Sequence, residues 1–534
     1  MSTICNPYLP IDEYIPDAEP HVFGDRIYIF GSHDQEGGYT YCMRDYVTYS
    51  APVTDLTDWR YEGVIYRADQ DPDYPNRKYM YAPDVVQGND GRFYLYYGMG
   101  GDYGIGGYHG PISVAVSDAV TGPYEYLGFV KNKDGSPMQK YVCFDPAVMN
   151  DDGVIRLYYG TQYSFEMEED FLTNGHLEDE MEMFNRTREE ILSYKDSING
   201  PSMLILEDDM MTVKEEARHI IPYDVRGTSF EAHPFFEGAS IRKIGTTYYF
   251  IYSSWLNHEL CYATSDKPDR DFVFGGTIVS NGDIGLNGRK AKDRLNMTGT
   301  THGSIENING KWYVFFHRLT HKSDYSRQAV AEEIRIEPDG SIRQVEITSC
   351  GLNGGPLPAE GSYPAVICCN LTNHHMPHGS NSIYKDAFPN VTHLNDDRFI
   401  GEIENETLIG YKFFDCKNVN KIGVTARAET PDNLVVLDVP LRRDERSDME
   451  GFEQAAATNS PDDTPKTVDG IAGTLDIRLS PDGDTIGQID IPEDDDPFRW
   501  LSCESEVSIP NGTHALYLVY HGATKIQLKD ICFN

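Results

Sequence analysis

The stretch YMYAPDVVQGNDGRFYLYYG, residues 79–98, contains the pattern that decides the fold. An acidic residue, Asp84, is followed by a turn containing Gly, Asn and Asp, and then by a dense run of Tyr and Leu. A turn of this composition that leads into aromatic residues is typical of a β-hairpin. A single hairpin would identify no fold, so the informative feature is its recurrence.

The pattern recurs at four other places in the first two thirds of the chain. The recurring stretches are DRIYIFGSHD (25–34), GVIRLYYGTQ (153–162), GTTYYFIYSS (245–254) and GKWYVFFHRL (310–319). Aligned on Tyr28, Tyr94, Arg156, Tyr248 and Tyr313, the repeats are separated by 66, 62, 92 and 65 residues. Self-similarity at a period of this size indicates a repeat architecture.

The long interval contains a segment of different character, residues 164–198, rich in Met, Glu and Leu. It lacks strand periodicity, and we interpret it as a helical insertion on one repeat. Two alternatives stay open for it: a solvated surface excursion, or a wall beside a functional site.

Strand, hairpin, strand and turn, repeated five times, predict an all-β fold that begins with a five-bladed β-propeller over residues 1–355. After a stretch rich in Gly and Pro, residues 349–364, the aromatic repeat stops. Short alternating segments follow, with Asp/Gly turns between them. Residues 356–534 therefore predict a linker and a β-sandwich.

Composition limits the function. The chain has 534 residues, which favours two domains, and a net charge of −40, which argues against nucleic acid and anionic membranes as partners. The ten cysteines are scattered without a CxxC pair, and no run of apolar residues reaches the length of a membrane span. No signal peptide is recognisable, and we expect a cytoplasmic protein.

Ionisable residues stand at a fixed distance before the repeated strands. They lie eleven residues before the anchor in four repeats and ten before it in the second, and are Asp17, Asp84, Asp145, Glu237 and His302. In a propeller the innermost strands converge on one axis, so these side chains are expected to meet. A single Asp before a hairpin is more often structural, but converging acids repel one another and folding does not require them. The set predicts a functional centre.

Isolated carboxylates, without a nucleophilic Ser or Cys or a phosphate loop, suit glycoside hydrolysis. One carboxylic acid protonates the leaving oxygen and one carboxylate acts on the opposite face of the sugar. A third acid nearby can raise the pKa of the proton donor through like-charge repulsion.

Five motifs resemble glycoside hydrolase family 43. They occur in order over about residues 7–345 and are YIPDAEPHVFGDRIYIFGSHD, YAPDV, FDPAVMNDDG, FFEGASIRKIGTTYYFIYSS and HGSIENINGKWYVFFHR. The resemblance implies an inverting mechanism, with Asp17 as general base, Asp84 as the residue that modulates the pKa and Glu237 as general acid. Many members have Asp-Pro at the base, whereas here Ala18 follows Asp17 and Glu19 precedes Pro20, so Glu19 is an alternative base.

The resemblance also implies roles around the centre. His302 matches a His that contacts calcium directly or through water, the alternative being a packed channel residue, and Arg327 matches an arginine that reaches a sugar hydroxyl. Asp145 is interpreted as structural or as a neighbour of the catalytic groups. Six aromatic residues near the motifs could stack on a sugar or belong to the core: Tyr39, Tyr103, Phe165, Phe230, Phe236 and Trp255. Of these, Tyr39, Phe236 and Trp255 are the expected substrate-binding residues.

The C-terminal region resembles a family 6 carbohydrate-binding module, through IGYKFFDCKNV (409–419) and THALYLVYHG (513–522) among others. Its last loop carries Lys525 and Gln527 without an aromatic pair, so we expect a sandwich that packs on the propeller and binds sugar weakly or not at all.

For the whole chain the resemblance implies an exo-acting α-L-arabinofuranosidase that takes arabinoxylan- or arabinan-derived oligosaccharides. The alternatives are a β-D-xylosidase and, in another class, a non-catalytic carbohydrate-binding propeller. The sequence leaves the oligomeric state open.

Overall fold

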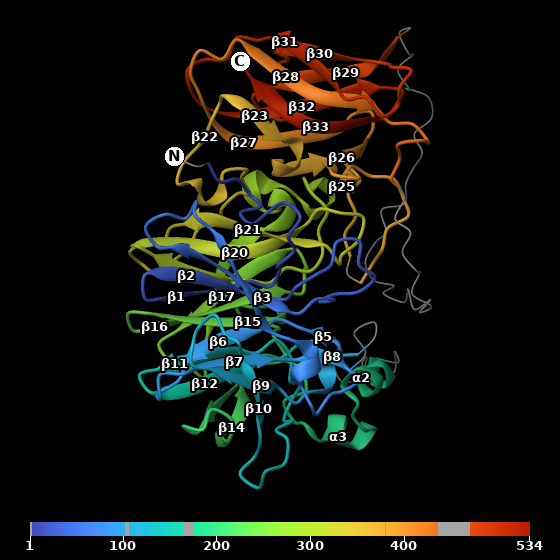
Figure 1. The fold of residues 1–534 in the computed structure, drawn as a ribbon. Helices are drawn as coiled ribbons and strands as arrows, with labels where there is room; N and C mark the ends of the chain where they lie inside the picture. Colours follow the sequence, from blue (N-terminus) through green and yellow to red (C-terminus); the bar gives the residue numbers. More distant parts are fainter. Residues whose placement is uncertain (1–2, 102–105, 164–175, 380, 436–469) are drawn as a thin grey trace.

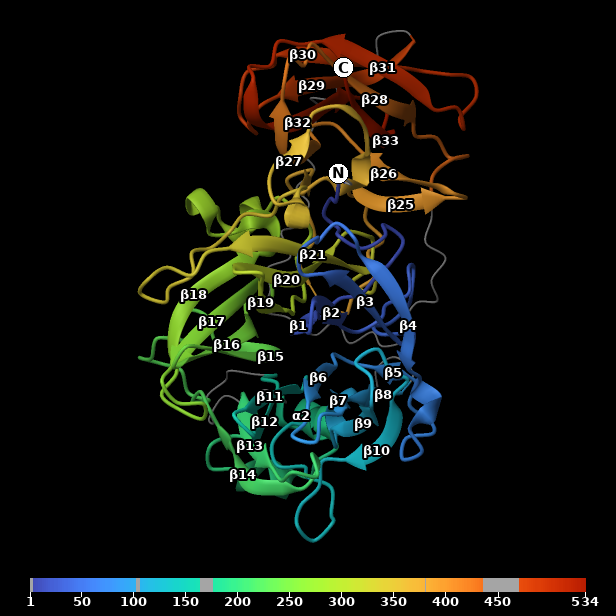
Figure 2. The same cartoon turned by 60° about the vertical axis from the view of Figure 1, so that its left-hand side comes forward.

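The computed structural model describes residues 3–101, 106–163, 176–379, 381–435 and 470–534, and shows a propeller with a β-sandwich stacked on it (Figures 1 and 2). The predicted all-β class, a five-bladed propeller followed by a sandwich, is confirmed. Each of the first four blades is a four-stranded antiparallel sheet, and the fifth has three strands.

The strands of the blades follow one another along the chain. The first blade contains β1 (Glu19–Phe23), β2 (Arg26–Phe30), β3 (Tyr46–Pro52) and β4 (Arg60–Tyr66). The second contains β6 (Asp84–Gln87), β7 (Phe93–Tyr97), β9 (Ser113–Ser117) and β10 (Glu125–Phe129), with the small ribbon β5 (Tyr79–Met80) and β8 (Met99–Gly100) beside it. The third contains β11 (Ala147–Asp151), β12 (Val154–Tyr159), β13 (Ser202–Leu206) and β14 (Val213–His219). The fourth contains β15 (Phe235–Ile244), β16 (Thr247–Ser254), β17 (Glu259–Ser265) and β18 (Val273–Ser280). The fifth contains β19 (Ser304–Ile308), β20 (Lys311–Leu319) and β21 (Arg327–Ile334).

The first strand of every blade lines the propeller axis. β1, β6, β11, β15 and β19 contact one another in a closed ring, and a parallel bridge between Ala18 and Gly303 joins the first blade to the last. A residue just before each first strand therefore points to the same central region.

The hairpins that the repeat predicts join the first two strands of each blade. Gly91 and Gly310 sit in these turns with φ of 84° and 87°, a conformation that side-chain-bearing residues rarely adopt. The aromatic second strands pack between neighbouring blades: one apolar cluster combines Tyr96 of the second blade with Leu157 of the third, and another closes the ring by combining Ile29 with Phe315. Each such buried side chain contributes roughly 1.5–3 kcal/mol.

Two short helices, α2 (His176–Phe184) and α3 (Arg188–Ser193), lie between the second and third strands of the third blade. Their residues Leu177, Phe184 and Ile191 pack against Phe144. Residues 164–175 of the expected insertion lie outside the described residues. Among the helices that are described, none is long and apolar enough to span a membrane.

The C-terminal region forms two packed sheets. One contains β22 (Leu357–Pro358), β24 (Asn370–Thr372), β27 (Leu408–Cys416), β29 (Ile471–Arg478), β30 (Gly487–Pro492) and β32 (Gly512–Gly522). The other contains β23 (Gly361–Pro364), β25 (Asn390–Leu394), β26 (Asp397–Ile403), β28 (Lys421–Ala428), β31 (Leu501–Glu506) and β33 (Ile526–Phe533). Their facing side chains, among them Ile409, Leu518, Ile422 and Ile531, form one core. All ten cysteines are described, and all are free thiols.

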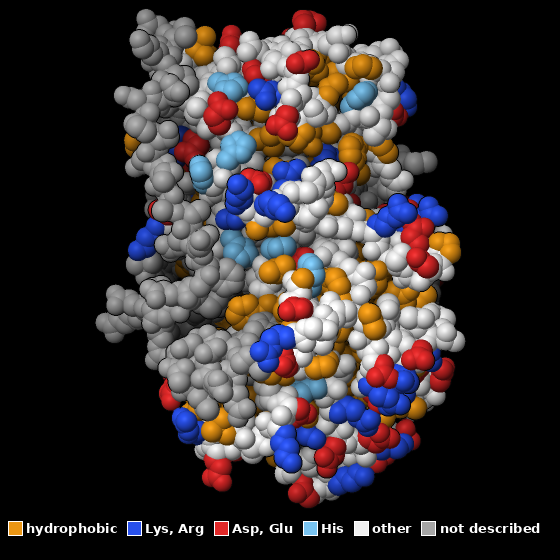
Figure 3. All heavy atoms as spheres, turned by 180° about the vertical axis from the view of Figure 1, so that it is seen from behind, with side chains coloured by type: hydrophobic (Ala, Val, Ile, Leu, Met, Phe, Trp, Pro, Cys, Tyr) orange, Lys and Arg blue, Asp and Glu red, His pale blue; other side chains and the backbone are white. Residues whose placement is uncertain are grey.

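The sandwich packs directly on the propeller. Lys412 Nζ lies 2.9 Å from a carboxylate oxygen of Asp283, and Arg318 Nη1 donates to the carbonyl of Cys368 at 3.0 Å. A small apolar cluster of Met297, Leu319, Met376 and Phe388 seals the same junction. On the face turned away from the viewer in Figure 1, histidine side chains gather over the sandwich and its junction with the propeller (Figure 3).

Candidate active site

The residues that precede the axial strands meet at one end of the propeller axis. Asp17, Asp145 and His302 each stand two residues before their strand. His302 Nδ1 lies 3.9 Å from Asp17 Oδ1 and 3.7 Å from Asp145 Oδ2. The backbone N–H of Gly238, next to Glu237, donates to Asp145 Oδ2 at 3.1 Å. The repeat phase thus predicted a real convergence.

Asp17 is held in one orientation by the last blade. Its φ of 59° is unusual for a residue with a side chain, and its backbone N–H donates to His317 Nδ1 at 3.3 Å. His317 Nε2 in turn donates to the carbonyl of Thr300 at 2.9 Å, which fixes the neutral tautomer. Burial lowers the pKa of His317 to about 3, so this ring stays neutral while it orients Asp17.

Arg327 is the closest cation to Asp17. Its Nη1 donates to Asp17 Oδ1 at 2.8 Å, while Nε and Nη2 donate to the two carboxylate oxygens of Asp34 at 2.8 and 3.0 Å. Burial would raise the pKa of Asp17, but the neighbouring groups, with Arg327 first among them, together outweigh burial and hold that pKa below its usual value. The expected contact of Arg327 with a sugar hydroxyl stays a prediction, because the structure shows this side chain buried between two carboxylates.

Glu237 lies on β15 where that strand is irregular. The pairing with β16 shifts between Phe235 and Glu237 and again between Glu237 and Ser240, which indicates a bulge. Gly238 occupies the bulge with φ of 71°, and a Cβ there would lie 3.0 Å from the ring of His302. The bulge turns Glu237 towards the axis, with its side chain partly exposed.

The pKa values of the two remaining carboxyls are raised. Burial, and then the negative charge of Asp17, raise the pKa of Glu237 to about 8. Burial, followed by repulsion from Glu237 and Asp17, raises the pKa of Asp145 well above its usual range. One carboxyl of the centre is therefore ionised near neutral pH, while Glu237 keeps its proton.

Asp84 does not share the depth of the other residues. It pairs with Tyr96 on the second strand, the register position that Glu19, Ala147 and Ser304 occupy opposite Phe30, Tyr158 and Phe315. Asp84 thus stands about two positions further along its strand than Asp17, and the prediction of one common depth is wrong for it. Two differences cause this displacement. The β6–β7 turn is longer than the β1–β2 turn, and Asp84 stands only ten residues before its anchor, so Asp84 pairs at the position of Glu19.

The side chain of Asp84 forms hydrogen bonds with His21 and Val148 and not with Asp17 or Glu237. Its Oδ1 lies 2.6 Å from His21 Nε2, and its Oδ2 accepts from the backbone N–H of Val148 at 2.7 Å. After burial, Glu237 is the first negative charge that raises the pKa of Asp145, and the backbone N–H of Gly238, next to Glu237, donates to Asp145 Oδ2. In the structure Asp145, which the sequence suggested was structural or a neighbour of the catalytic groups, therefore interacts more directly with Glu237 than Asp84 does. The sequence contained one sign of this difference: Asp84 stands ten residues before its anchor, whereas the other four residues stand eleven before theirs.

Glu19, the alternative base, is engaged elsewhere. Arg242 Nη2 donates to Glu19 Oε2 at 3.0 Å, and burial raises the pKa of Glu19 to about 7. A base must be ionised, so these properties favour Asp17.

His302 fits a contact with a cation or its water. Burial lowers the pKa of His302, so the ring is neutral, and its Nε2 is buried without a hydrogen-bond partner among the described residues. Nearby on the axis, Glu19, His21 and Asp84 offer ligand atoms within 4.8 Å of one another. A set that is mainly carboxylate oxygen suits calcium.

The three aromatic residues expected to bind a sugar lie on two blades. Phe236 is at the start of β15 and Trp255 directly follows β16, whereas Tyr39 is in the loop after β2. The rings of Phe236 and Trp255 meet edge to face at 6.1 Å, and Trp255 Nε1 donates to the carbonyl of Gln162 at 2.8 Å. Tyr39 shares a hydrogen bond of 2.7 Å with Tyr79. All three aromatic side chains are partly exposed, and their role in stacking stays a prediction.

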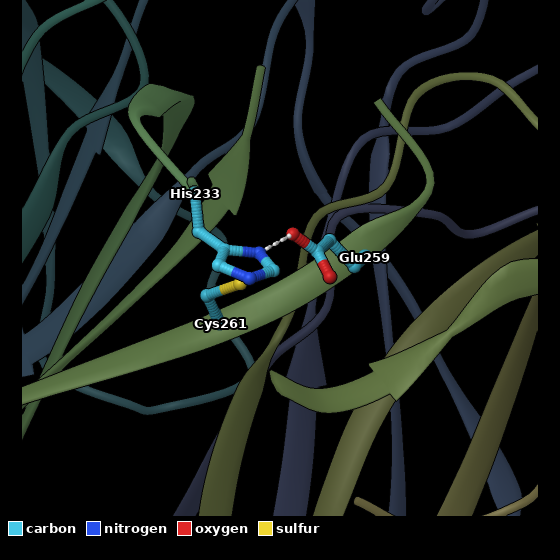
Figure 4. A group of neighbouring side chains, drawn as sticks. All are labelled: His233, Glu259 and Cys261. Atoms are coloured by element: carbon cyan, nitrogen blue, oxygen red, sulfur yellow. Dashed lines mark hydrogen bonds and ion pairs between the residues drawn. The ribbon is translucent and has the colours of Figure 1, made fainter. Parts of the chain in front are cut away.

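A second group of potential metal ligands, His233, Glu259 and Cys261, lies on the fourth blade (Figure 4). Glu259 already accepts hydrogen bonds from His233 at 2.5 Å, Ser254 at 2.7 Å and Thr277 at 2.8 Å. Burial raises the pKa of the Cys261 thiol well above its usual value, which opposes metal binding as thiolate. We interpret the group as a hydrogen-bonded anchor for the segment that leads into β15.

Comparison with known proteins identifies relatives of this chain. A family model described as glycosyl hydrolases family 43 matches residues 10–195. The chain is 38% identical over 547 residues to a protein named xylosidase/arabinosidase from Thermoclostridium stercorarium, covering 98% of each. It is 29% identical to a xylosidase/arabinosidase from Bacteroides ovatus, covering 64% of this chain and 97% of that protein.

Solved structures include a β-xylosidase/α-arabinofuranosidase from a compost microbial metagenome, in complex with xylotriose and in a calcium-free form. That chain is 26% identical, with a TM-score of 0.45, and the match covers 62% of this chain and 94% of that one. On the identity over its whole length to the Thermoclostridium stercorarium protein, the chain belongs to glycosyl hydrolase family 43.

Proposed function

We propose that the protein is an inverting exo-glycosidase that releases terminal α-L-arabinofuranose from arabinoxylan- or arabinan-derived oligosaccharides. The observation that carries the proposal is the opposite displacement of two pKa values in one centre, lowered for Asp17 and raised to about 8 for Glu237. An ionised carboxylate and a protonated carboxyl are the two groups that inverting hydrolysis needs at the same pH.

In this mechanism Asp17 is the general base and Glu237 the general acid. Asp17 takes a proton from the water that attacks the anomeric carbon, and Arg327 keeps Asp17 ionised until that step. Glu237 gives its proton to the oxygen of the departing sugar, whose poor leaving ability requires it. Asp145 takes the place predicted for Asp84, because repulsion between Asp145 and Glu237 favours the protonated form of the pair.

A calcium ion on the axis is part of the proposal. His302, through Nε2, would hold the ion or one of its waters, and the ion would add a fixed positive charge to the centre. Chelation is expected to lower the melting temperature of wild type, and the decrease should be much smaller in His302→Ala. Equal decreases in both would remove the ion from this site.

A β-D-xylosidase activity of the same site is the second candidate. Relatives that cover 98% and 64% of this chain are named for both activities. The test is kcat/KM for 4-nitrophenyl α-L-arabinofuranoside against 4-nitrophenyl β-D-xyloside. We expect the arabinofuranoside to be the better substrate, and a xyloside value well above it would reverse the assignment.

A further inference from the structure

Two loops of the propeller carry the groups that hold Asp17. The loop after β2 contains Asp34, and the loop between β20 and β21 ends at Arg327. The loops are joined to each other, because the backbone N–H of Gly37 donates to Ser326 Oγ at 3.1 Å. Any element that holds these loops also determines where Arg327 places its guanidinium.

The sandwich grips the first loop through Glu36. Arg398 of β26 donates with both terminal nitrogens to the two oxygens of Glu36, one of the contacts being 2.9 Å. His393 of β25 and His321 of the propeller lie 3.1 and 3.0 Å from the same carboxylate. Figures 1 and 2 show β25 and β26 on the side of the sandwich that faces the propeller. These hydrogen bonds outweigh the effect of burial and hold the pKa of Glu36 below its usual value.

The C-terminal chain also grips the second loop. The backbones of Asp324 and Ser382 are joined, because Asp324 N–H donates to the Ser382 carbonyl at 3.0 Å and Ser382 N–H donates to Asp324 Oδ2 at 2.8 Å. The N–H of Asn381 donates to Tyr41 Oη at 3.2 Å. The ring of Tyr41 lies 4.6 Å from Arg327 Cζ, so this contact reaches the cation that binds Asp17.

We infer that the C-terminal sandwich is a positioning part of the catalytic centre, in which Arg398 acts through Glu36 to fix the Asp34–Arg327–Asp17 array. The inference deepens the proposed function, since it rests on the base role of Asp17. Arg398 touches no catalytic group itself, and its effect on the rate passes through the geometry of the base. A misplacement of about 1 Å in such an array costs up to roughly a hundredfold in rate.

The test is a double-mutant cycle between Arg398 and the base, in the full-length protein. Arg398→Met in the wild-type background should lower kcat by about tenfold or more, with a smaller change in KM. In Asp17→Ala, azide replaces the attacking water and requires no base. There Arg398→Met should change the azide-supported rate on a dinitrophenyl glycoside by less than about twofold, because the geometry of the base no longer matters.

Lys412→Met is the matched control. Lys412 forms an ion pair across the same junction, with Asp283 at 2.9 Å, and its side chain is as buried as that of Asp283. Its loss should lower the melting temperature while kcat stays within about twofold of wild type, because the pair does not lead to Asp17. Glu36→Gln keeps the shape of the side chain and should lower kcat as Arg398→Met does. It replaces Arg398→Met in the test if Arg398→Met folds poorly.

The outcomes separate this inference from the proposed function. If Arg398→Met and Glu36→Gln lower only the melting temperature, as Lys412→Met does, the inference is overturned. It is also overturned if Arg398→Met costs the same factor in both backgrounds. If Asp17→Ala retains wild-type kcat, the proposed base is wrong, and the inference falls with it.

Discussion

Asp17 and Glu237 are carboxylic acids of one centre, yet their pKa values are displaced in opposite directions. Arg327 touches Asp17 at 2.8 Å and stabilises its negative charge, whereas Glu237, which is largely withdrawn from solvent and lies near the negative charge of Asp17, holds its proton up to a pKa of about 8. At neutral pH one group can accept a proton and the other can donate one. This division of roles depends on single neighbours, so it is tested one residue at a time.

Asp145→Asn should move the basic limb of the pH profile of kcat/KM to lower pH. Glu237 is active when protonated, so activity is lost as pH rises through its pKa. Asp145 and Glu237 repel each other when both are ionised, and Asp145→Asn removes that repulsion, so Glu237 is expected to ionise at lower pH. Asp84→Asn is the control and should leave the basic limb in place. A limb that moves for Asp84→Asn and stays for Asp145→Asn would restore the role predicted from sequence.

Part of this centre was predictable from the sequence and part was not. The eleven-residue spacing located Asp17, Asp145, Glu237 and His302, because hairpin length and strand register are local properties. The environment of Arg327 could not be predicted, because its partner Asp34 is 293 residues away and meets it only when the ring of blades closes. Our proposal gives Asp145 the role that the sequence assigned to Asp84. The two residues lie at different depths because the β6–β7 turn is longer and the spacing of Asp84 is shorter, which places Asp84 at the register of Glu19 and not of Asp17.

The bulge in β15 is the element that presents Glu237, the proposed proton donor. Regular pairing would carry residues 235–240 on alternate faces, whereas the two register shifts around Glu237 redirect it. Gly238 makes the bulge compatible with the ring of His302, which lies 3.0 Å from the place where a Cβ would stand. The sequence FFEGAS contains this glycine but does not reveal that the axis is so crowded.

Gly238→Ala should lower kcat/KM by at least about tenfold. A residue with a side chain at φ of 71° costs about 1–2 kcal/mol, and its Cβ would also lie 3.0 Å from His302. Gly245→Ala, in the β15–β16 turn of the same blade, has a similar φ of 62° but no atom within 4 Å of the new Cβ. This control should lose stability and keep its activity, and equal activity losses in the two variants would refute the steric argument.

The sandwich has the properties of a packing partner for the propeller. Gln527, which the sequence placed in the last loop, lies on β33 instead, where it is fully buried and bound to Arg427 and Asn433. Trp500 packs over Arg427 and donates from Nε1 to Asp397 at 2.8 Å. Both side chains are engaged within the sandwich, and weak or absent sugar binding by this domain stays a prediction.

Deleting residues 365–534 should leave an insoluble or much less stable propeller. The deletion removes the partners of buried Arg318 and Asp283 and exposes the apolar cluster around Met297 and Leu319. Soluble yield and melting temperature are the measurements. A truncated chain that stays folded and keeps its activity on aryl glycosides would identify the sandwich as an independent module.

At the scale of the whole chain, the sequence predicted the five blades and the sandwich well. Each blade repeats one hairpin signal, so the evidence adds up over five copies. The close docking of the sandwich was not predictable in detail. Pairs such as Lys412–Asp283 join residues that are far apart in the sequence, and charged residues of these types are ordinarily found on a protein surface. The contacts that link the sandwich to the base are of the same kind.

The central claim is that Glu237 donates the proton to the leaving group and Asp17 activates the water. The most direct test is the rate of Glu237→Ala on an arabino-oligosaccharide compared with its rate on a dinitrophenyl α-L-arabinofuranoside, with Asp17→Ala measured alongside. A sugar alcohol needs a proton to depart and dinitrophenolate does not. Glu237→Ala should therefore lose on the order of a hundredfold or more on the oligosaccharide and keep much of its rate on the dinitrophenyl substrate, whereas Asp17→Ala should be inactive on both. Equal losses of the two variants on the two substrates would contradict the assigned roles.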